Sequence, residues 1–222
     1  MDALIVDWMR SPFHRAHKGG LKEVRPDEMA GQVARALLAL NNIPAKQIDD
    51  LLLGCAYPEG EQGYNVARLV SFLSGLPDTV PGATFNRLCG SSMEAIHVAA
   101  GKISTGSGNC FLVGGMESMS RVKRRGFNWS PHPGLEESFP EAYINMGITA
   151  ENVADKYSIN RIRQEEFALS SHQKSHFARL EGNFANEICP IVHGEETIDS
   201  DGCIRPSSNL ESMAGLNPVF KE

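Results

Sequence analysis

One cysteine in this sequence stands where a nucleophile could act. Cys89 lies in the stretch NRLCGSSMEA, between a short apolar segment and a predicted helix that begins near Ser91. Unpaired N–H groups at a helix N-terminus stabilise an anion, so a thiol placed there has a larger thiolate fraction. They can also hold the oxyanion formed when a thiolate attacks a carbonyl, and Gly90 lets a substrate approach the backbone. Cysteine is equally common as a small packed residue in turns, and the local pattern leaves both interpretations open.

The helix behind Cys89 is predicted to run from about Ser91 to Ile103. Ser91 and Glu94 have the S-x-x-E spacing of a capping box. Apolar residues leave almost no polar face; they are Met93, Ala95, Ile96, Val98, Ala99, Ala100 and Ile103. A helix that is apolar all round must be covered all round. We therefore expect the central helix of a layered fold, and any uncovered face to be an exposed apolar patch that marks a missing partner.

The first part of the chain alternates between predicted strands and helices. Apolar runs predict strands at 3–7, 51–55, 83–86 and 110–114, and helical spacing predicts helices at 26–40, 65–74 and 91–103. This alternation of strands and helices predicts an α/β fold, with a largely parallel sheet and helices on its faces. Glu117, just after the last of these strands, is expected to make a structural ion pair and no catalytic contribution.

A second region is expected from residue 118 onward. Residues 118–145 show no sustained period, and helices are predicted at about 149–157 and 163–180, the latter capped by Asn160. A strand is predicted at 188–192, and a capping-box pattern at Ser208 opens a last short helix. The expected organisation is an α/β domain over 1–117 and a mainly helical domain over 118–222.

Composition narrows the classes of function. The formal net charge is −6, which argues against nucleic-acid binding. No apolar run approaches the length of a membrane span, and the N-terminus does not read as a secretory signal. The cysteines are odd in number and none form a C-x-x-C pair; they are Cys55, Cys89, Cys110, Cys189 and Cys203. Free thiols in a reducing cytoplasm are therefore expected, and no metal site, since His172 and His176 fit a solvated helix face.

Motifs along the whole chain resemble one family. NRLCGSSMEAIHVAA resembles the nucleophile segment of the thiolases, and VDWMRSPFHRAHKGG resembles their N-terminal strand and turn. The resemblance continues through the segment ahead of their second helix, EQGYNVAR, and the strand after the nucleophile helix, CFLVGGMESMSRV. It extends into their loop domain through MGITAENVADKY, NRIRQEEFALSSHQKS and NLESMAGLNPVF. The resemblance implies a thiolase-like layered fold made of the N-terminal half and the loop domain. EQGYNVAR with NRLCGSSM is most similar to the 3-ketoacyl-CoA thiolases of fatty-acid β-oxidation.

The resemblance also implies a reaction and its residues. In thiolases the nucleophilic cysteine takes an acyl group from a 3-ketoacyl-CoA and releases acetyl-CoA, and a second CoA collects the shortened acyl group. Cys89 matches that cysteine. Met146, Arg205, Leu216 and Phe220 match positions that line the CoA tunnel or contact the nucleotide. Core packing for the three apolar residues, and a surface ion pair for Arg205, are the competing interpretations.

The family's second half is absent from this sequence. That half brings the histidine that activates the nucleophile, a second cysteine that acts as acid and base, and an asparagine motif that positions a water. We therefore expect this chain alone to turn over poorly. A non-catalytic half-thiolase that binds CoA or a partner, and a biosynthetic acetyl-CoA acetyltransferase, are the alternatives.

Two other enzyme classes fit less well. Ser92 and Met93 depart from the papain-like pattern around a catalytic cysteine, and the loop-domain match argues against a ketosynthase. The thiolase resemblance further implies acyl-CoA and CoA as substrates with no cofactor, a cytoplasmic homodimer, and association with a multifunctional β-oxidation subunit.

Overall fold

The computed structural model describes residues 2–221. The chain forms two compact units. The first comprises the residues up to Asn128 together with Asn186–Cys203, and the second comprises Trp129–Ala185 together with the residues from Ile204 onward. Cys89 belongs to the first unit.

Strands and helices alternate through the first unit. Its helical elements are η1 (Gly20–Glu23), α1 (Pro26–Leu40), η2 (Ala45–Gln47), η3 (Gly60–Gln62), α2 (Val66–Leu73) and α3 (Ser91–Ser104). Its strands are β1 (Asp50–Gly54), β2 (Gly82–Phe85), β3 (Phe111–Gly115), β4 (Ile191–His193) and β5 (Glu196–Ile198). The last two form an antiparallel hairpin.

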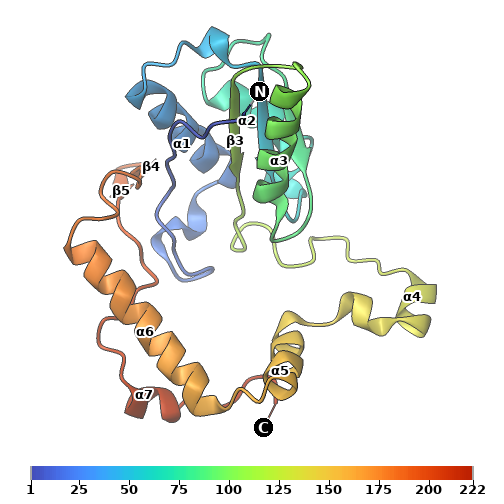
Figure 1. Ribbon diagram of the computed structural model, residues 1–222, viewed down its shortest axis with the longest axis vertical. Helices are drawn as coiled ribbons and strands as arrows, with labels where there is room; N and C mark the ends of the chain where they lie inside the picture. The colour runs from blue at the N-terminus through green and yellow to red at the C-terminus, as the bar shows by residue number, and fades with distance from the viewer. Residues whose placement is uncertain (1, 222) are drawn as a thin grey trace. The chain divides into compact units, whose positions relative to one another are not determined.

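The main sheet is parallel, as the alternating pattern predicts. β1 lies between β2 and β3 and pairs in parallel with both. One face carries Leu51 and Leu53, which pack into a core with residues of α1 and α2. The opposite face carries Leu52, against which Ala95 and Ala99 of α3 pack. The sheet therefore separates α1 and α2 from α3 (Figure 1).

The strand predicted at 3–7 is wrong. These residues take no strand structure, and the side chains of Leu4, Ile5 and Val6 are largely exposed. A strand needs a neighbour for its backbone N–H and C=O groups. The first backbone pairing of the N-terminal segment comes at Arg10, which bonds to residues 187 and 189.

The predicted domain boundary at residue 118 is displaced. Residues beyond 117 still pack on the first unit: Val122 is fully buried, and the Ser118 N–H donates to the Gln62 Oε1 at 2.7 Å. The segment 186–203 returns to the same unit, where the Asp201 carboxylate accepts two hydrogen bonds from the Arg10 guanidinium. Contacts between residues distant in sequence set this boundary, and the loss of periodicity at 118 does not reveal them.

The second unit is helical, as predicted. Its elements are α4 (Pro133–Ser138), η4 (Pro140–Tyr143), α5 (Met146–Lys156), α6 (Arg161–Leu180) and α7 (Leu210–Ala214). Asn160 caps α6 through its bond from the Arg163 N–H. The cap predicted at Ser208 is wrong, because Asn209 caps α7 by accepting the Ser212 N–H at 2.8 Å.

Candidate active site

The parallel strands of the main sheet end at one edge, and the chain segments that leave them meet there. β1 leads into Cys55 and Ala56, β2 into residues 86–89, and β3 into Glu117. Such an edge is where open α/β sheets bind ligands. Cys89 lies here, between the end of β2 and the start of α3.

Glycines let the N-terminus of α3 lie directly on this edge. A Cβ atom on Gly54 would lie 2.3 Å from the Ser92 nitrogen and 2.4 Å from the Ser91 carbonyl carbon. A Cβ on Gly115 would lie 2.7 Å from the Ser92 Cβ. Real Cβ contacts are not this short, so both strand ends must be glycine for α3 to approach so closely. The close approach fixes where the helix begins and therefore where Cys89 stands.

The turn before α3 is held by side chains. Leu88 adopts a left-handed backbone conformation with φ 47°. The Asn86 Oδ1 accepts the Leu88 N–H at 2.9 Å, and the Ser91 Oγ accepts the Arg87 N–H at 2.9 Å while donating to the Leu88 carbonyl at 2.5 Å. Together these bonds define the path of the backbone on both sides of Cys89.

The capping box predicted at Ser91 and Glu94 is wrong. Ser91 is the first residue of α3, Gly90 occupies the cap position, and no side chain caps the helix. The Ser91 Oγ bonds within the preceding turn instead, and the Glu94 carboxylate pairs with Arg87 at 2.7 Å. The first-turn N–H groups of α3 are thus not covered by a side chain at the cap position.

The thiol of Cys89 is exposed. Within residues 2–221 no side chain hydrogen-bonds to its Sγ. His97, on the same helix, lies eight residues further along the chain and is exposed. The described residues therefore present an accessible thiol at a helix N-terminus without a base in contact with it.

A buried polar network lies beside this turn. The Glu117 carboxylate accepts the Ala56 N–H at 2.7 Å and the Gln62 Nε2–H at 2.5 Å. The expected ion pair of Glu117 is replaced by these hydrogen bonds. Burial, reinforced by the Glu117 charge, raises the pKa of the neighbouring Cys55 thiol to about 12. Cys55 is therefore a poor nucleophile, although it lies at the same edge of the sheet.

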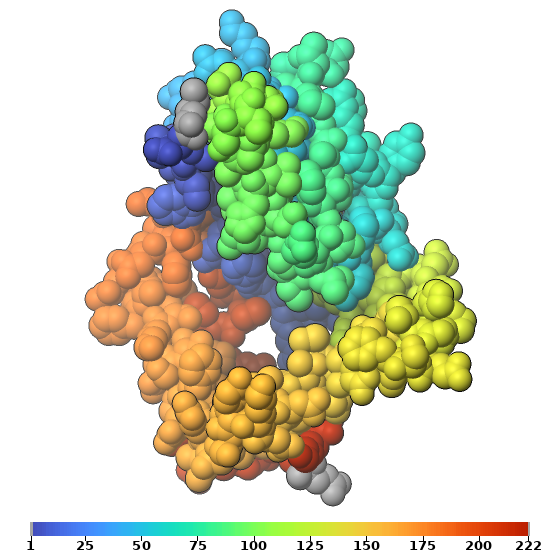
Figure 2. Space-filling view, turned by 45° about the vertical axis from the view of Figure 1, so that its right-hand side comes forward, coloured from blue at the N-terminus to red at the C-terminus, as the bar shows by residue number. Residues whose placement is uncertain are grey.

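The outer face of α3 is uncovered in the first unit. Ala95 is fully buried against the sheet, whereas Met93 is 56% exposed and Ile96 is 39% exposed. Figure 2 shows the green surface of α3 open on the face turned toward the viewer. Within residues 2–221 α3 is covered on one side only, so the expected fully covered central helix is not found, while Met93 and Ile96 are exposed as expected of an uncovered face.

The other predicted site residues all lie in the second unit. Met146 is the first residue of α5, and the Phe220 ring lies against the adjacent Gly147, where a Cβ would meet it at 2.2 Å. The Leu216 carbonyl accepts a hydrogen bond from the Arg161 Nη2 at 2.9 Å. The Met146, Leu216 and Phe220 side chains are each at least 48% exposed, so core packing does not explain them. Arg205 lies elsewhere in the unit, with its N–H donating to the His172 Nδ1 at 3.3 Å.

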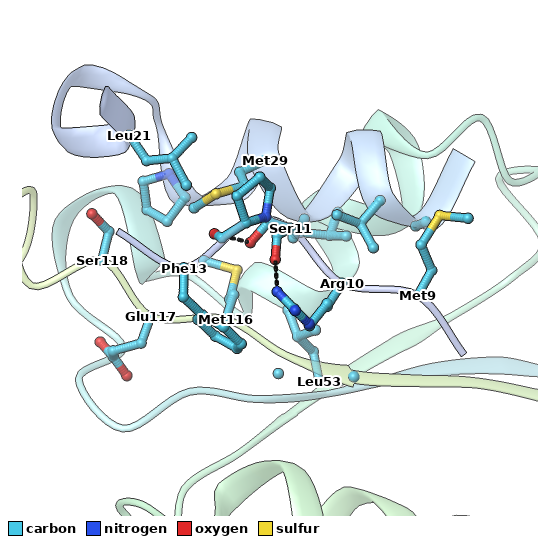
Figure 3. A pocket seen from close by; sticks show the side chains of 18 of the residues that line it. Met9, Arg10, Ser11, Phe13, Leu21, Met29, Leu53, Met116, Glu117 and Ser118 are labelled. Atoms are coloured by element: carbon cyan, nitrogen blue, oxygen red, sulfur yellow. Dashed lines mark hydrogen bonds between the residues drawn. The ribbon is translucent and has the colours of Figure 1, made fainter. Parts of the chain in front are cut away.

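A cavity of the first unit has a mostly apolar lining and does not include Cys89. Its volume is about 350 Å³, and residues 9–16, α1, β1 and β3 line it. Figure 3 shows Met29, Leu53 and Met116 facing this space, with Arg10 at one side. Because α1 contributes much of the lining, the cavity lies on the face of the sheet opposite α3. It is therefore separate from the candidate nucleophile.

Residues 2–221 contain neither a cluster of metal-ligating side chains nor a helix able to cross a membrane. No group of three or more His, Cys, Asp or Glu side chains is arranged to hold a metal ion. None of the helices in this part of the chain combines the length and apolar character needed to cross a membrane.

Comparison with known proteins identifies the family of this chain. Residues 3–222 match the family model for the thiolase N-terminal domain. The chain is 42% identical to a 3-ketoacyl-CoA thiolase of Shewanella loihica, 41% to one of Serratia proteamaculans and 40% to one of Saccharophagus degradans. These matches cover 98–99% of this chain and 57–58% of each relative.

The chain thus spans a little over half the length of the curated relatives it matches. The parallel sheet, the glycine-lined approach of α3 and the cysteine at its N-terminus all fall within the matched residues. This chain belongs to the thiolase family, whose N-terminal domain it contains.

Proposed function

We propose that Cys89 is the acyl-accepting nucleophile of a thiolase that cleaves 3-ketoacyl-CoA with CoA. The observation that carries the proposal is the position of the exposed thiol at the uncapped N-terminus of α3, on the carboxyl edge of a parallel sheet. N–H groups at such a terminus favour both a thiolate and an oxyanion on an attacked carbonyl. The relatives' name, 3-ketoacyl-CoA thiolase, supports the substrate class.

The proposed reaction has two acyl-transfer steps. The Cys89 thiolate attacks the 3-keto carbon and forms a thioester. The bond between C2 and C3 breaks, its electron pair remains on C2, and protonation there gives acetyl-CoA. The thiol of a second CoA then loses its proton, attacks the thioester and leaves with the shortened acyl group, which restores the Cys89 thiolate. CoA carries the acyl group in the first step and is itself a substrate in the second step, and no cofactor is needed.

The proposal includes a CoA site on the second unit. The Phe220 ring lies against Gly147, which follows Met146 at the N-terminus of α5, and the Met146 and Phe220 side chains are both exposed. An exposed pair of flexible apolar side chains suits the pantetheine arm of CoA. Arg205 and Leu216 are proposed as further CoA contacts on the strength of their motifs. Of the expected CoA-binding region 118–222, we propose the part that belongs to the second unit.

Both steps need proton transfers that Cys89 cannot perform. A base must remove the thiol proton and an acid must protonate C2, and within residues 2–221 neither group bonds to Cys89. We assign both groups to the part of the relatives that lies beyond the match. A cytoplasmic homodimer that associates with a multifunctional β-oxidation subunit completes the proposal.

Exchange of labelled CoA into acetyl-CoA tests this chemistry. The 222-residue chain is incubated with acetyl-CoA and isotopically labelled CoA, beside Cys89→Ser and Cys203→Ser variants. We expect slow exchange that Cys89→Ser abolishes and Cys203→Ser preserves, with thiolysis of a 3-ketoacyl-CoA far slower than in a full-length relative. Exchange that survives Cys89→Ser would overturn the assigned nucleophile, and rapid thiolysis would overturn the assignment of the acid and base elsewhere.

A second function is favoured by the uncovered face of α3. Met93 and Ile96 are exposed beside a thiol that lacks a base. A non-catalytic half-thiolase that binds CoA or a partner protein would show both features. Tight CoA binding with no acyl exchange would support this alternative.

A further inference from the structure

Asn86 ties the turn that carries Cys89 to the neighbouring strand end. Its Oδ1 accepts the Leu88 N–H at 2.9 Å, and its Nδ2 donates to the Ala56 carbonyl at 3.1 Å. A side-chain amide offers a donor and an acceptor at this distance from the backbone, so one residue makes both bonds. The segment after β2 is thereby joined to the segment after β1.

The conformation of Leu88 needs such support. A φ of 47° places this leucine in the left-handed region, which residues with a Cβ adopt at a cost. The Leu88 side chain is 58% exposed, so packing contributes little to holding it. The bond from the Leu88 N–H to Asn86 is of the kind by which asparagine stabilises turns.

Ala56, the other partner of Asn86, is itself held by hydrogen bonds. The Ala56 N–H donates to Glu117, which also accepts from Gln62. Gln62 is fully buried, and its Oε1 accepts the Ser118 N–H at 2.7 Å. A continuous series of hydrogen bonds therefore runs from a buried glutamine, through Glu117, Ala56 and Asn86, to the residue directly before Cys89.

We propose that Asn86 is a positioning residue, which holds the Leu88–Cys89 turn so that the thiol stays at the N-terminus of α3. The proposal rests on the proposed function only in that Cys89 is the group being positioned. Asn86 does not touch the thiol. Its effect passes through the backbone of Leu88, and the buried network around Glu117 gives it a fixed anchor.

The test compares thiols within one molecule. The rate of alkylation by iodoacetamide is measured peptide by peptide for Cys89 and for Cys203, a second exposed thiol. In Asn86→Ala we expect the ratio of the Cys89 rate to the Cys203 rate to fall about threefold, the scale of a helix-terminus effect on an exposed group. Cys55 and Cys189 are buried and report whether the unit remains folded.

Asn65 offers a matched control. Its side chain also makes two bonds, donating to the Gly82 carbonyl and accepting the Thr84 hydroxyl, each at 2.9 Å. Asn65 itself has a left-handed backbone conformation with φ 49°, unlike Asn86, so replacing Asn65 by alanine costs stability without touching the turn at Cys89. We expect Asn65→Ala to leave the ratio unchanged. An equal fall in both variants would show a general structural effect and overturn the proposal.

Two more variants separate positioning from folding. Asn86→Ser keeps an acceptor for the Leu88 N–H but is too short to reach Ala56, so we expect a smaller fall than with alanine. Leu88→Gly relieves the left-handed strain, and we expect it to restore part of the lost reactivity when added to Asn86→Ala. If Asn86→Ala exposes Cys55 and Cys189, Asn86→Ser carries the comparison. A wild-type ratio in Asn86→Ser and Asn86→Ala would overturn the proposal.

Acetyl transfer distinguishes this inference from the proposed function. If the wild-type chain takes no acetyl group from acetyl-CoA, the expected slow acyl exchange by this chain fails, while the alkylation ratios still decide the role of Asn86. If it does, we expect acetyl loading to slow in Asn86→Ala and not in Asn65→Ala. Equal loading in the two variants would contradict positioning by Asn86.

Discussion

The backbone of Ser92 rests on Gly54: a Cβ atom at Gly54 would lie 2.3 Å from the Ser92 nitrogen. Gly54 ends β1, and Ser92 is the second residue of α3. The helix that follows Cys89, the proposed nucleophile, therefore starts in direct backbone contact with the central strand. This contact connects the packing of the sheet to the position of Cys89, and it can be tested separately from the chemistry.

Gly54→Ala should displace α3 and weaken the fold. The added methyl group meets backbone atoms, which cannot move aside as a side-chain tip can. We expect a loss of about 2–3 kcal/mol in the free energy of unfolding, measured by urea denaturation. Gly101→Ala is the control on the same helix, because nothing lies within 4 Å of its added Cβ. Alanine there should be neutral or stabilising, and equal losses in both variants would contradict the close contact.

Substitutions on the two sides of α3 should differ in how much they lower the free energy of unfolding. Met93→Gln changes an exposed side chain, and we expect the free energy of unfolding to change by less than about 0.5 kcal/mol. Ala95→Leu overfills a site against the sheet and should cost about 1–3 kcal/mol. Urea denaturation measures both. A costly Met93→Gln would mean that the outer face of α3 is already covered in this chain.

Acid should remove the stabilisation that Asp201 provides. Burial raises the pKa of this carboxyl, but hydrogen bonds from Arg10 and the Phe13 N–H outweigh burial, so the pKa lies below its ordinary value of 3.8. The folded pKa is therefore below the unfolded one. The contribution is fully present above the unfolded pKa and is lost as the pH falls through the folded pKa.

Asp201→Asn should thus cost most at neutral pH. We expect a loss of about 2 kcal/mol in the free energy of unfolding near pH 7, shrinking to less than about 0.5 kcal/mol near pH 2. Asp155→Asn is the control, since Asp155 pairs with Lys221 while both side chains are more than half exposed, and it should cost under about 0.5 kcal/mol. A cost for Asp201→Asn that is independent of pH would contradict the pairing with Arg10.

Gly147→Ala should weaken CoA binding without unfolding the chain. The added Cβ would lie 2.2 Å from the Phe220 ring, and the ring can swing away from α5. We expect the Kd for CoA, measured by calorimetry, to rise about fivefold, the scale of one aromatic contact. Gly215→Ala is the control, since its Cβ has only ordinary contacts beginning at 3.7 Å. Unchanged affinity in Gly147→Ala would remove Phe220 from the proposed CoA site.

Much of the first unit could be predicted because its strands and helices have clear local patterns of apolar residues. The apolar run at 51–55 and the helical spacing over 26–40 fall within one residue of β1 and match α1. The apolar character of α3 also predicted a patch, which Met93 and Ile96 form. The run at 3–7 looked equally strand-like, yet a strand exists only where another strand pairs with it.

The supports of Cys89 could not be predicted because they join distant residues. Asn86 bonds to Ala56, 30 residues earlier, and Glu117 bonds to Gln62, 55 residues earlier. The sequence marks Gly54 only as a small residue at a strand end, and its need for space appears once α3 lies on it. The positive φ of Leu88 has no local signal, since asparagine and glycine are the usual residues there.

The most direct test of the account is the mass of the intact chain after incubation with acetyl-CoA, followed by peptide mapping. The account predicts one added acetyl group, carried by Cys89, absent from Cys89→Ser and retained in Cys203→Ser. No adduct on a Cys89 that iodoacetamide still modifies readily would contradict it, because the thiol would then be accessible at its helix N-terminus but unable to accept an acyl group.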